Sequence, residues 1–147
     1  MSLEVKWYLP GRIIYSYDVL SVPDRIERNR QVLRLLTTEG QPPTVHLLID
    51  FSSTGHGNYT TGLQAMIERQ ETNEELKQLT QQIAEHPLFG WVVSIGEQNR
   101  PLTAAATVLA NKLKYRRRSV ATLQDALEFL KQVDSSLADL LNSRVEK

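Results

Sequence analysis

The chain has 147 residues, no cysteine, and 17 basic and 17 acidic residues. This length is enough for one domain to bury a core, so we expect a single domain over residues 1–147. The lack of cysteine excludes disulfides, thiolate chemistry and cysteine-rich zinc sites, and the zero formal charge argues against a dedicated nucleic-acid binder.

The first part of the chain predicts a hairpin and a helix. β-Branched and aromatic runs at 3–9 and 12–17 flank Pro10-Gly11, which is typical of a hairpin turn. Helical spacing follows over 24–38, with Asp24 as the expected N-cap. Four arginines are placed on the side of this helix opposite its apolar residues: Arg25, Arg28, Arg30 and Arg34.

The middle of the chain predicts a buried strand, a loop and two helices. Residues 45–51 form a nearly unbroken apolar run, which suits a strand buried on both faces at the centre of a parallel or mixed sheet. A loop rich in Ser, Thr, Gly and Asn covers 52–62. Helical spacing then predicts helices at about 60–71 and 73–85, with Thr72 in a capping box of the second.

The last third predicts two strands and two or more helices. A strand is expected at 91–96, a helix from Pro101, and a short edge strand at 118–121. Thr122 caps an amphipathic helix, and the apolar pattern extends past Asp134 as a continued or restarted helix. The whole order predicts an α/β fold with a mixed, mostly parallel sheet of about five strands, ordered ββαβαβαβα and covered by helices.

Two segments carry a resemblance to a known family. Residues 47–52, Leu-Leu-Ile-Asp-Phe-Ser, and residues 119–130, Ser-Val-Ala-Thr-Leu-Gln-Asp-Ala-Leu-Glu-Phe-Leu, resemble the STAS-like, SpoIIAA-like family of bacterial regulatory domains. That family includes a branch related to lipid-binding domains. The resemblance implies a SpoIIAA/STAS-like sandwich and a regulatory, protein-binding role.

The resemblance also points to a phosphorylation site in the loop after the central strand. The family's loop carries a Ser that is a kinase target, and Thr60 falls on that position within Tyr59-Thr60-Thr61-Gly62-Leu63. Tyr59 stands where the family has Asp. On the residues alone, Thr60 is a cap of the next helix.

Ligands of open α/β sheets collect beyond the carboxyl ends of the strands, and three segments are expected there: 17–22, 50–62 and 96–100. The candidate ligand or partner residues there are Asp50, Ser52, Ser53, His56, Asn58, Tyr59, Thr60 and Thr61. The Asp, Ser and His residues of this set are too close in sequence for a catalytic triad. The three histidines lack metal-ligand spacing, and no cofactor motif occurs. We therefore expect no catalytic residue, metal site or cofactor.

Other singled-out residues have structural explanations. His46 is expected to be a packed or edge histidine, and Trp7 and Trp91 are expected to pack in or near the core. A basic cluster follows the helix predicted from Pro101: Lys112, Lys114, Arg116, Arg117 and Arg118. A helix C-terminus and an edge strand both favour cations, and binding of an acidic partner, lipid head group or nucleic acid is the competing explanation.

The leading hypothesis is a non-enzymatic regulatory or protein-interaction module. The alternative is a carrier or sensor that holds a small anionic or lipid-like ligand at the carboxyl ends of the strands. No apolar stretch approaches the roughly 18 residues that span a bilayer, and the N-terminus has no apolar signal core, so we expect a cytoplasmic protein. A net charge near zero favours self-association and thus a homodimer.

Overall fold

The structure is a computed structural model that describes residues 5–17, 22–51, 74–96, 111 and 114–145. The strands are β1 (Val5–Leu9), β2 (Ile13–Tyr17), β3 (Val45–Asp50), β4 (Phe89–Ile95) and β5 (Arg116–Val120). The helices are α1 (Val22–Glu39), α3 (Glu74–Glu85), α5 (Leu123–Val133) and α6 (Ser136–Val145). The predicted helices at 60–71 and from Pro101 lie outside the described residues.

The five strands form one mixed sheet in the order β1-β2-β3-β4-β5. The β1–β2 pair is antiparallel, and each later pair is parallel. Gly11 turns the first pair with a φ of 77°, a backbone conformation that favours glycine. The predicted α/β class, opening hairpin and mostly parallel sheet are therefore confirmed.

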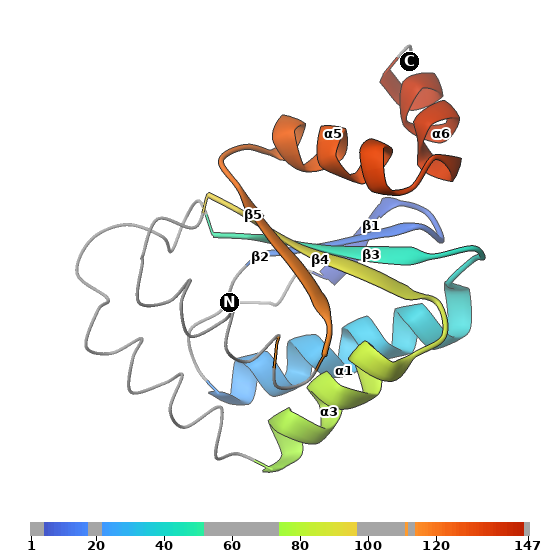
Figure 1. Ribbon diagram of the computed structural model, residues 1–147. Helices are drawn as coiled ribbons and strands as arrows, with labels where there is room; N and C mark the ends of the chain where they lie inside the picture. Colours follow the sequence, from blue (N-terminus) through green and yellow to red (C-terminus); the bar gives the residue numbers. More distant parts are fainter. Residues whose placement is uncertain (1–4, 18–21, 52–73, 97–110, 112–113, 146–147) are drawn as a thin grey trace.

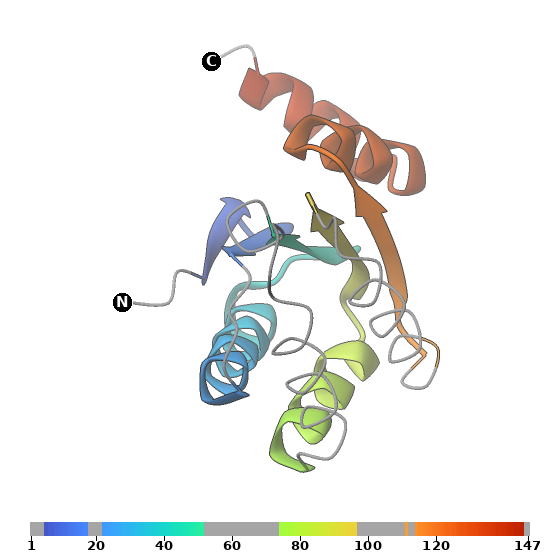
Figure 2. The ribbon, with the colours of Figure 1, turned by 90° about the vertical axis from the view of Figure 1, so that its left-hand side faces the viewer.

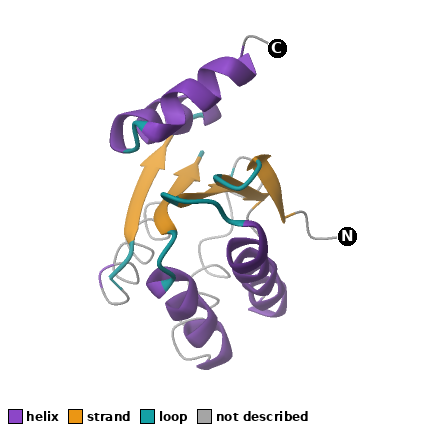
Figure 3. Ribbon diagram, turned by 90° about the vertical axis from the view of Figure 1, so that its right-hand side faces the viewer, coloured by secondary structure: helices purple, strands orange, loops and turns teal. Residues whose placement is uncertain are grey.

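The sheet lies between two layers of helices. α5 and α6 lie on one face, and α1 and α3 lie on the other (Figures 1, 2 and 3). Side chains alternate between the faces of a strand, so Leu47 and Ile49 pack in the α1/α3 core and Leu48 packs in the α5/α6 core. The central strand β3 is thus buried on both faces, as its unbroken apolar run predicted.

Helix α1 departs from the prediction in its polar residues. One buried stripe runs the length of the helix: Arg25, Arg28, Asn29, Val32, Leu35 and Leu36. These positions share one helical face because they recur at three- and four-residue intervals. The assignment of Arg25 and Arg28 to the exposed side was therefore wrong, although Arg30 and Arg34 are exposed. The helix also begins at Val22, so Asp24 lies in its first turn and is not its N-cap.

The C-terminal helices begin and end where their polar residues predict. The Thr122 hydroxyl accepts a hydrogen bond from the Asp125 backbone N–H at 3.1 Å, which confirms the predicted cap. The chain is extended at Asp134 and starts a new helix at Ser136, so the second helical segment is a restart. In the described part of the chain, every helix is too short or too polar to cross a membrane.

Candidate functional site

Two tyrosines and a carboxylate meet at the carboxyl ends of β2 and β3. Asp50 is the last residue of β3, and Tyr17 is its register partner at the end of β2. The Tyr15 hydroxyl donates a hydrogen bond to the Asp50 carboxylate. The rings of Tyr15 and Tyr17 meet edge to face, with centroids 5.4 Å apart and planes at 88°.

Charge and burial hold Tyr15 in its protonated form. Burial raises the pKa of Tyr15 well above its usual value, and the hydrogen bond and negative charge of Asp50 raise it further. Lys6, opposite Tyr15 on β1, places its ammonium 5.9 Å from the ring centroid. Tyr17 remains 43% exposed. We call Lys6, Tyr15, Tyr17 and Asp50 the tyrosine surface.

The tyrosine surface contains one of the residues proposed from sequence. Asp50 lies in it, half-buried at the end of β3. The other candidates lie outside the described residues: Ser52, Ser53, His56, Asn58, Tyr59, Thr60 and Thr61. Tyr17 begins one of the segments expected at the strand ends, 17–22. Sequence reasoning missed Tyr15, because its approach to Asp50 depends on the β2–β3 register, although its alternation with Tyr17 along a predicted strand was a visible signal.

A second polar group, the Asp134 cluster, lies at the amino ends of β2 and β3. It consists of Arg12, Thr44, His46, Asp134 and Ser136. Asp134 Oδ2 accepts hydrogen bonds from Thr44 Oγ1 at 2.6 Å and from His46 Nε2 at 2.9 Å. The same oxygen forms an ion pair with Arg12 Nη2 at 3.1 Å. Asp134 Oδ1 accepts from the Ser136 hydroxyl at 2.5 Å and from its backbone N–H at 3.1 Å.

The Asp134 cluster fixes the charges of its own members. Burial alone would raise the pKa of Asp134, but hydrogen bonds from Ser136, Thr44 and His46 outweigh it and hold the pKa well below its usual range. Burial lowers the pKa of His46 below its usual value, and the charge of Arg12 acts in the same direction against the raising effect of Asp134. Asp134 is therefore a carboxylate, and His46 is neutral at pH 7.

Both ring nitrogens of His46 are engaged within the fold. Nδ1 accepts a hydrogen bond from the Trp91 backbone N–H at 3.0 Å, so the ring proton is on Nε2, facing Asp134. A β carbon at Gly90 would lie 2.5 Å from ring atoms of His46, which requires glycine there. The side chain is 2% exposed. The prediction of a packed histidine is confirmed, and this geometry gives His46 a structural role because both ring nitrogens are hydrogen-bonded within the fold.

The comparisons with known proteins add no identification. No family model matches the chain, and no curated protein or solved structure matches it significantly. Within the described residues, no three His, Asp or Glu side chains gather in a way that could hold a metal ion. The residues of the tyrosine surface are suited to binding through aromatic area and charge.

Proposed function

We propose that the chain is a non-enzymatic regulatory module that binds a protein partner through its tyrosine surface. The observation that carries this proposal is the exposed ring of Tyr17, held against Tyr15, whose hydroxyl is bonded to Asp50. Tyrosine is enriched in protein interfaces because it offers a large, rigid contact area with a polar end. Oppositely charged groups at Lys6 and Asp50 flank the rings and would fix the orientation of a partner.

The resemblance to STAS-like domains belongs to the same proposal. A mixed five-stranded sheet with helices on both faces is compatible with the architecture that the resemblance implies. In such domains the loop after the central strand carries regulation, and here that loop would begin directly after the β3 residue Asp50, beside Tyr17. The resemblance implies that a modification of Thr60, which lies outside the described residues, would regulate the binding of the partner.

Site-specific photo-crosslinking in the native cells tests the proposed partner surface. We expect a benzoyl-phenylalanine at position 17 to trap one protein of defined mass, because Tyr17 would be in the interface. The same probe at Gln132, an exposed position on α5, serves as the matched control. The trapped protein is then purified, and Tyr17→Ala is expected to weaken its binding by about tenfold or more, as for an interface anchor. Equal trapping at the two positions, or equal affinity of the variant, contradicts the proposal.

A carrier or sensor of a small anionic or lipid-like ligand is the second candidate function. It is favoured by the burial of Arg25 and Arg28, which lie in the first turns of α1, just after β2 reaches the carboxyl edge of the sheet. Arginine suits phosphate and carboxylate groups because it offers paired donors.

Thermal unfolding with inorganic phosphate and with vesicles of an anionic lipid tests this second function. A ligand at about 100 times its Kd stabilises the folded state by about 2.7 kcal/mol, so the midpoint is expected to rise by several degrees. Arg25→Gln is expected to remove that rise, whereas Arg34→Gln, at an exposed position of the same helix, retains it. An unchanged midpoint for the wild-type chain contradicts the carrier function.

A further inference from the structure

Two arginines on the edge strand β5 are held in place by aromatic rings. The Arg116 guanidinium lies 5.8 Å from the centroid of Trp91, its register partner on β4. The Arg118 guanidinium lies 5.2 Å from the centroid of Phe129 on α5. Trp91 and Phe129 themselves meet edge to face at 4.9 Å. The rings thus orient both cations and limit the side-chain entropy that binding would cost.

The two guanidinium groups keep their hydrogen-bonding capacity. Arg116 and Arg118 are exposed, and their contacts within the described residues are with the rings, with no ion pair or hydrogen bond to a carboxylate. The neighbouring acid on α5, Glu128, is engaged with Lys131 and Gln124. Arg117, between the two, faces the other side of the sheet and donates to Ser94 Oγ at 3.3 Å. Stacking on a ring leaves the N–H edge of a guanidinium available to an anion.

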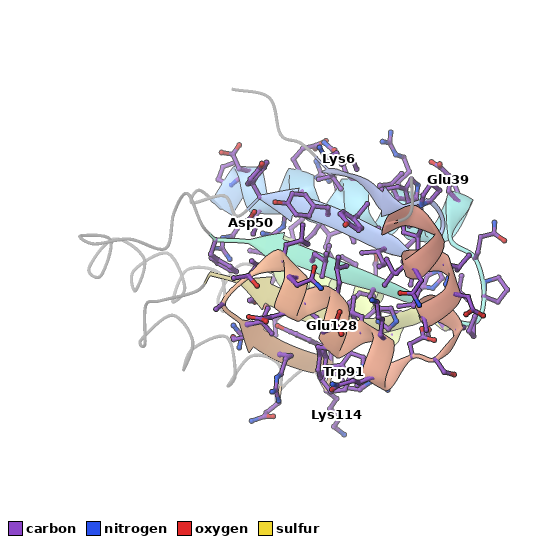
Figure 4. All side chains as sticks on the ribbon, turned by 90° about the horizontal axis from the view of Figure 1, so that it is seen from above. Lys6, Glu39, Asp50, Trp91, Lys114 and Glu128 are labelled. Carbon is purple, nitrogen blue, oxygen red and sulfur yellow. The ribbon has the colours of Figure 1, made fainter. Side chains whose placement is uncertain are left out.

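The position of β5 adds a second means of recognition. Within the described residues β5 pairs with β4 alone and ends the sheet. Figure 4 shows Trp91 and Lys114 along this edge and Lys6 toward the opposite one. A strand that paired with β5 would place alternate side chains directly opposite Arg116 and Arg118, because cross-strand neighbours on one face recur every second residue.

We propose that β5 binds an extended peptide segment with acidic residues at alternate positions, which adds a sixth strand to the sheet. The backbone of the segment would pair with the edge of β5, and its acidic side chains would meet Arg116 and Arg118. A second copy of the same strand does not fit, because its arginines would repel the first pair. A nucleic acid fits less well, because its backbone requires a wide basic surface and the chain has zero net formal charge.

Fluorescence anisotropy with short labelled peptides at low ionic strength tests this proposal. The probes are a peptide that alternates Glu and Thr, a charge-reversed peptide that alternates Lys and Thr, and one that alternates Glu and Pro. The Glu-Pro probe carries the same charge, but every second residue lacks an N–H and has its φ fixed at about −65°, which disfavours a regular paired strand. We expect the wild-type chain to bind the Glu-Thr probe about tenfold more tightly than the other two, a difference of about 1.4 kcal/mol.

Charge exchange supplies the decisive variants. We expect R116E/R118E to lose binding of the Glu-Thr probe and to gain binding of the Lys-Thr probe. The matched control is R30E/R34E, which changes the charge equally on α1, on the opposite face of the sheet. R116Q/R118Q is expected to bind neither probe while it retains its circular dichroism spectrum, which separates lost binding from lost folding.

Three results would overturn the proposal. Equal binding of the Glu-Thr and Glu-Pro probes would mean that charge alone acts, without strand pairing. Tighter binding of a single-stranded oligonucleotide or of anionic lipid vesicles than of the Glu-Thr probe would assign the arginines to those ligands instead. Equal loss of binding in the α1 control would mean that the net charge, and not the β5 edge, attracts the peptide.

Discussion

The carboxylate of Asp134 joins the amino ends of β2 and β3 to the C-terminal helices α5 and α6. Its Oδ2 binds Arg12 just before β2, Thr44 just before β3 and His46 of β3. Its Oδ1 binds Ser136 at the start of α6. Arg12, its cationic partner, is 6% exposed. A charge buried to this extent is stable only when it is paired. The ion pair with Asp134 therefore offsets the cost of burying the Arg12 guanidinium.

Asp134→Asn is expected to lower the free energy of unfolding by about 3–5 kcal/mol, because it leaves Arg12 buried without an anion. Urea denaturation followed by circular dichroism measures the change. Asp139→Asn, at an exposed carboxylate in the first turn of α6, is the matched control, and we expect it to cost less than about 1 kcal/mol. Similar losses in the two variants would mean that Asp134 contributes little beyond an ordinary surface charge.

At the scale of elements, α5 is positioned by its cap and by its apolar face. Ala126, Leu127 and Leu130 of α5 pack on the sheet with Leu137 and Leu141 of α6. The cap at Thr122 and the break at Asp134 set the length of α5, so that α6 can turn and cover the remaining part of this core. The same helix supplies Phe129, against which Arg118 is held.

Thr122→Ala is expected to destabilise the chain by about 1 kcal/mol, because the Asp125 N–H loses its acceptor at the start of α5. Thr122→Ser retains a hydroxyl at the cap and is expected to restore most of the loss. Thermal and urea unfolding of the two variants measure the difference. If alanine and serine are equally stable, the side-chain cap makes no contribution.

At the scale of the whole molecule, the Asp134 cluster makes stability depend on pH. The pKa values of His46 and Asp134 are both lowered by folding. As the pH falls, the unfolded chain therefore binds more protons than the folded chain. The difference arises first at His46, below about pH 6.5, and then at Asp134, below about pH 4. The stabilisation is present above pH 6.5 and declines on acidification.

We expect the free energy of unfolding to fall between pH 7 and pH 5, with a slope of at most about 1.4 kcal/mol per pH unit for one proton. Urea unfolding at a series of pH values measures this slope. His46→Gln is expected to be less stable at pH 7 but to show a flatter profile over this range. A wild-type slope in the His46 variant would assign the titration to another group.

Much of the fold could be predicted from local patterns. Apolar alternation and runs, the Pro10-Gly11 turn and the Thr122 cap depend on residues close in sequence, and the structure confirms them. The boundaries of β5 were less certain: it begins at Arg116, two residues before the predicted start, because parallel pairing with β4 extends it. Of the eight residues predicted for the ligand or partner loop, Asp50 alone lies in the described part of the chain.

The sequence by itself determined the α/β class, the order of most of the described elements and the burial of β3 on both faces, because periodicity and turn chemistry are local properties. Only the tertiary structure decided that Asp134 accepts a hydrogen bond from His46 and pairs with Arg12. It also decided that Tyr15 donates a hydrogen bond to Asp50 and that Arg25 and Arg28 are buried. Those contacts join residues far apart in the chain or depend on the packing of a whole helix, and register and packing bring them together.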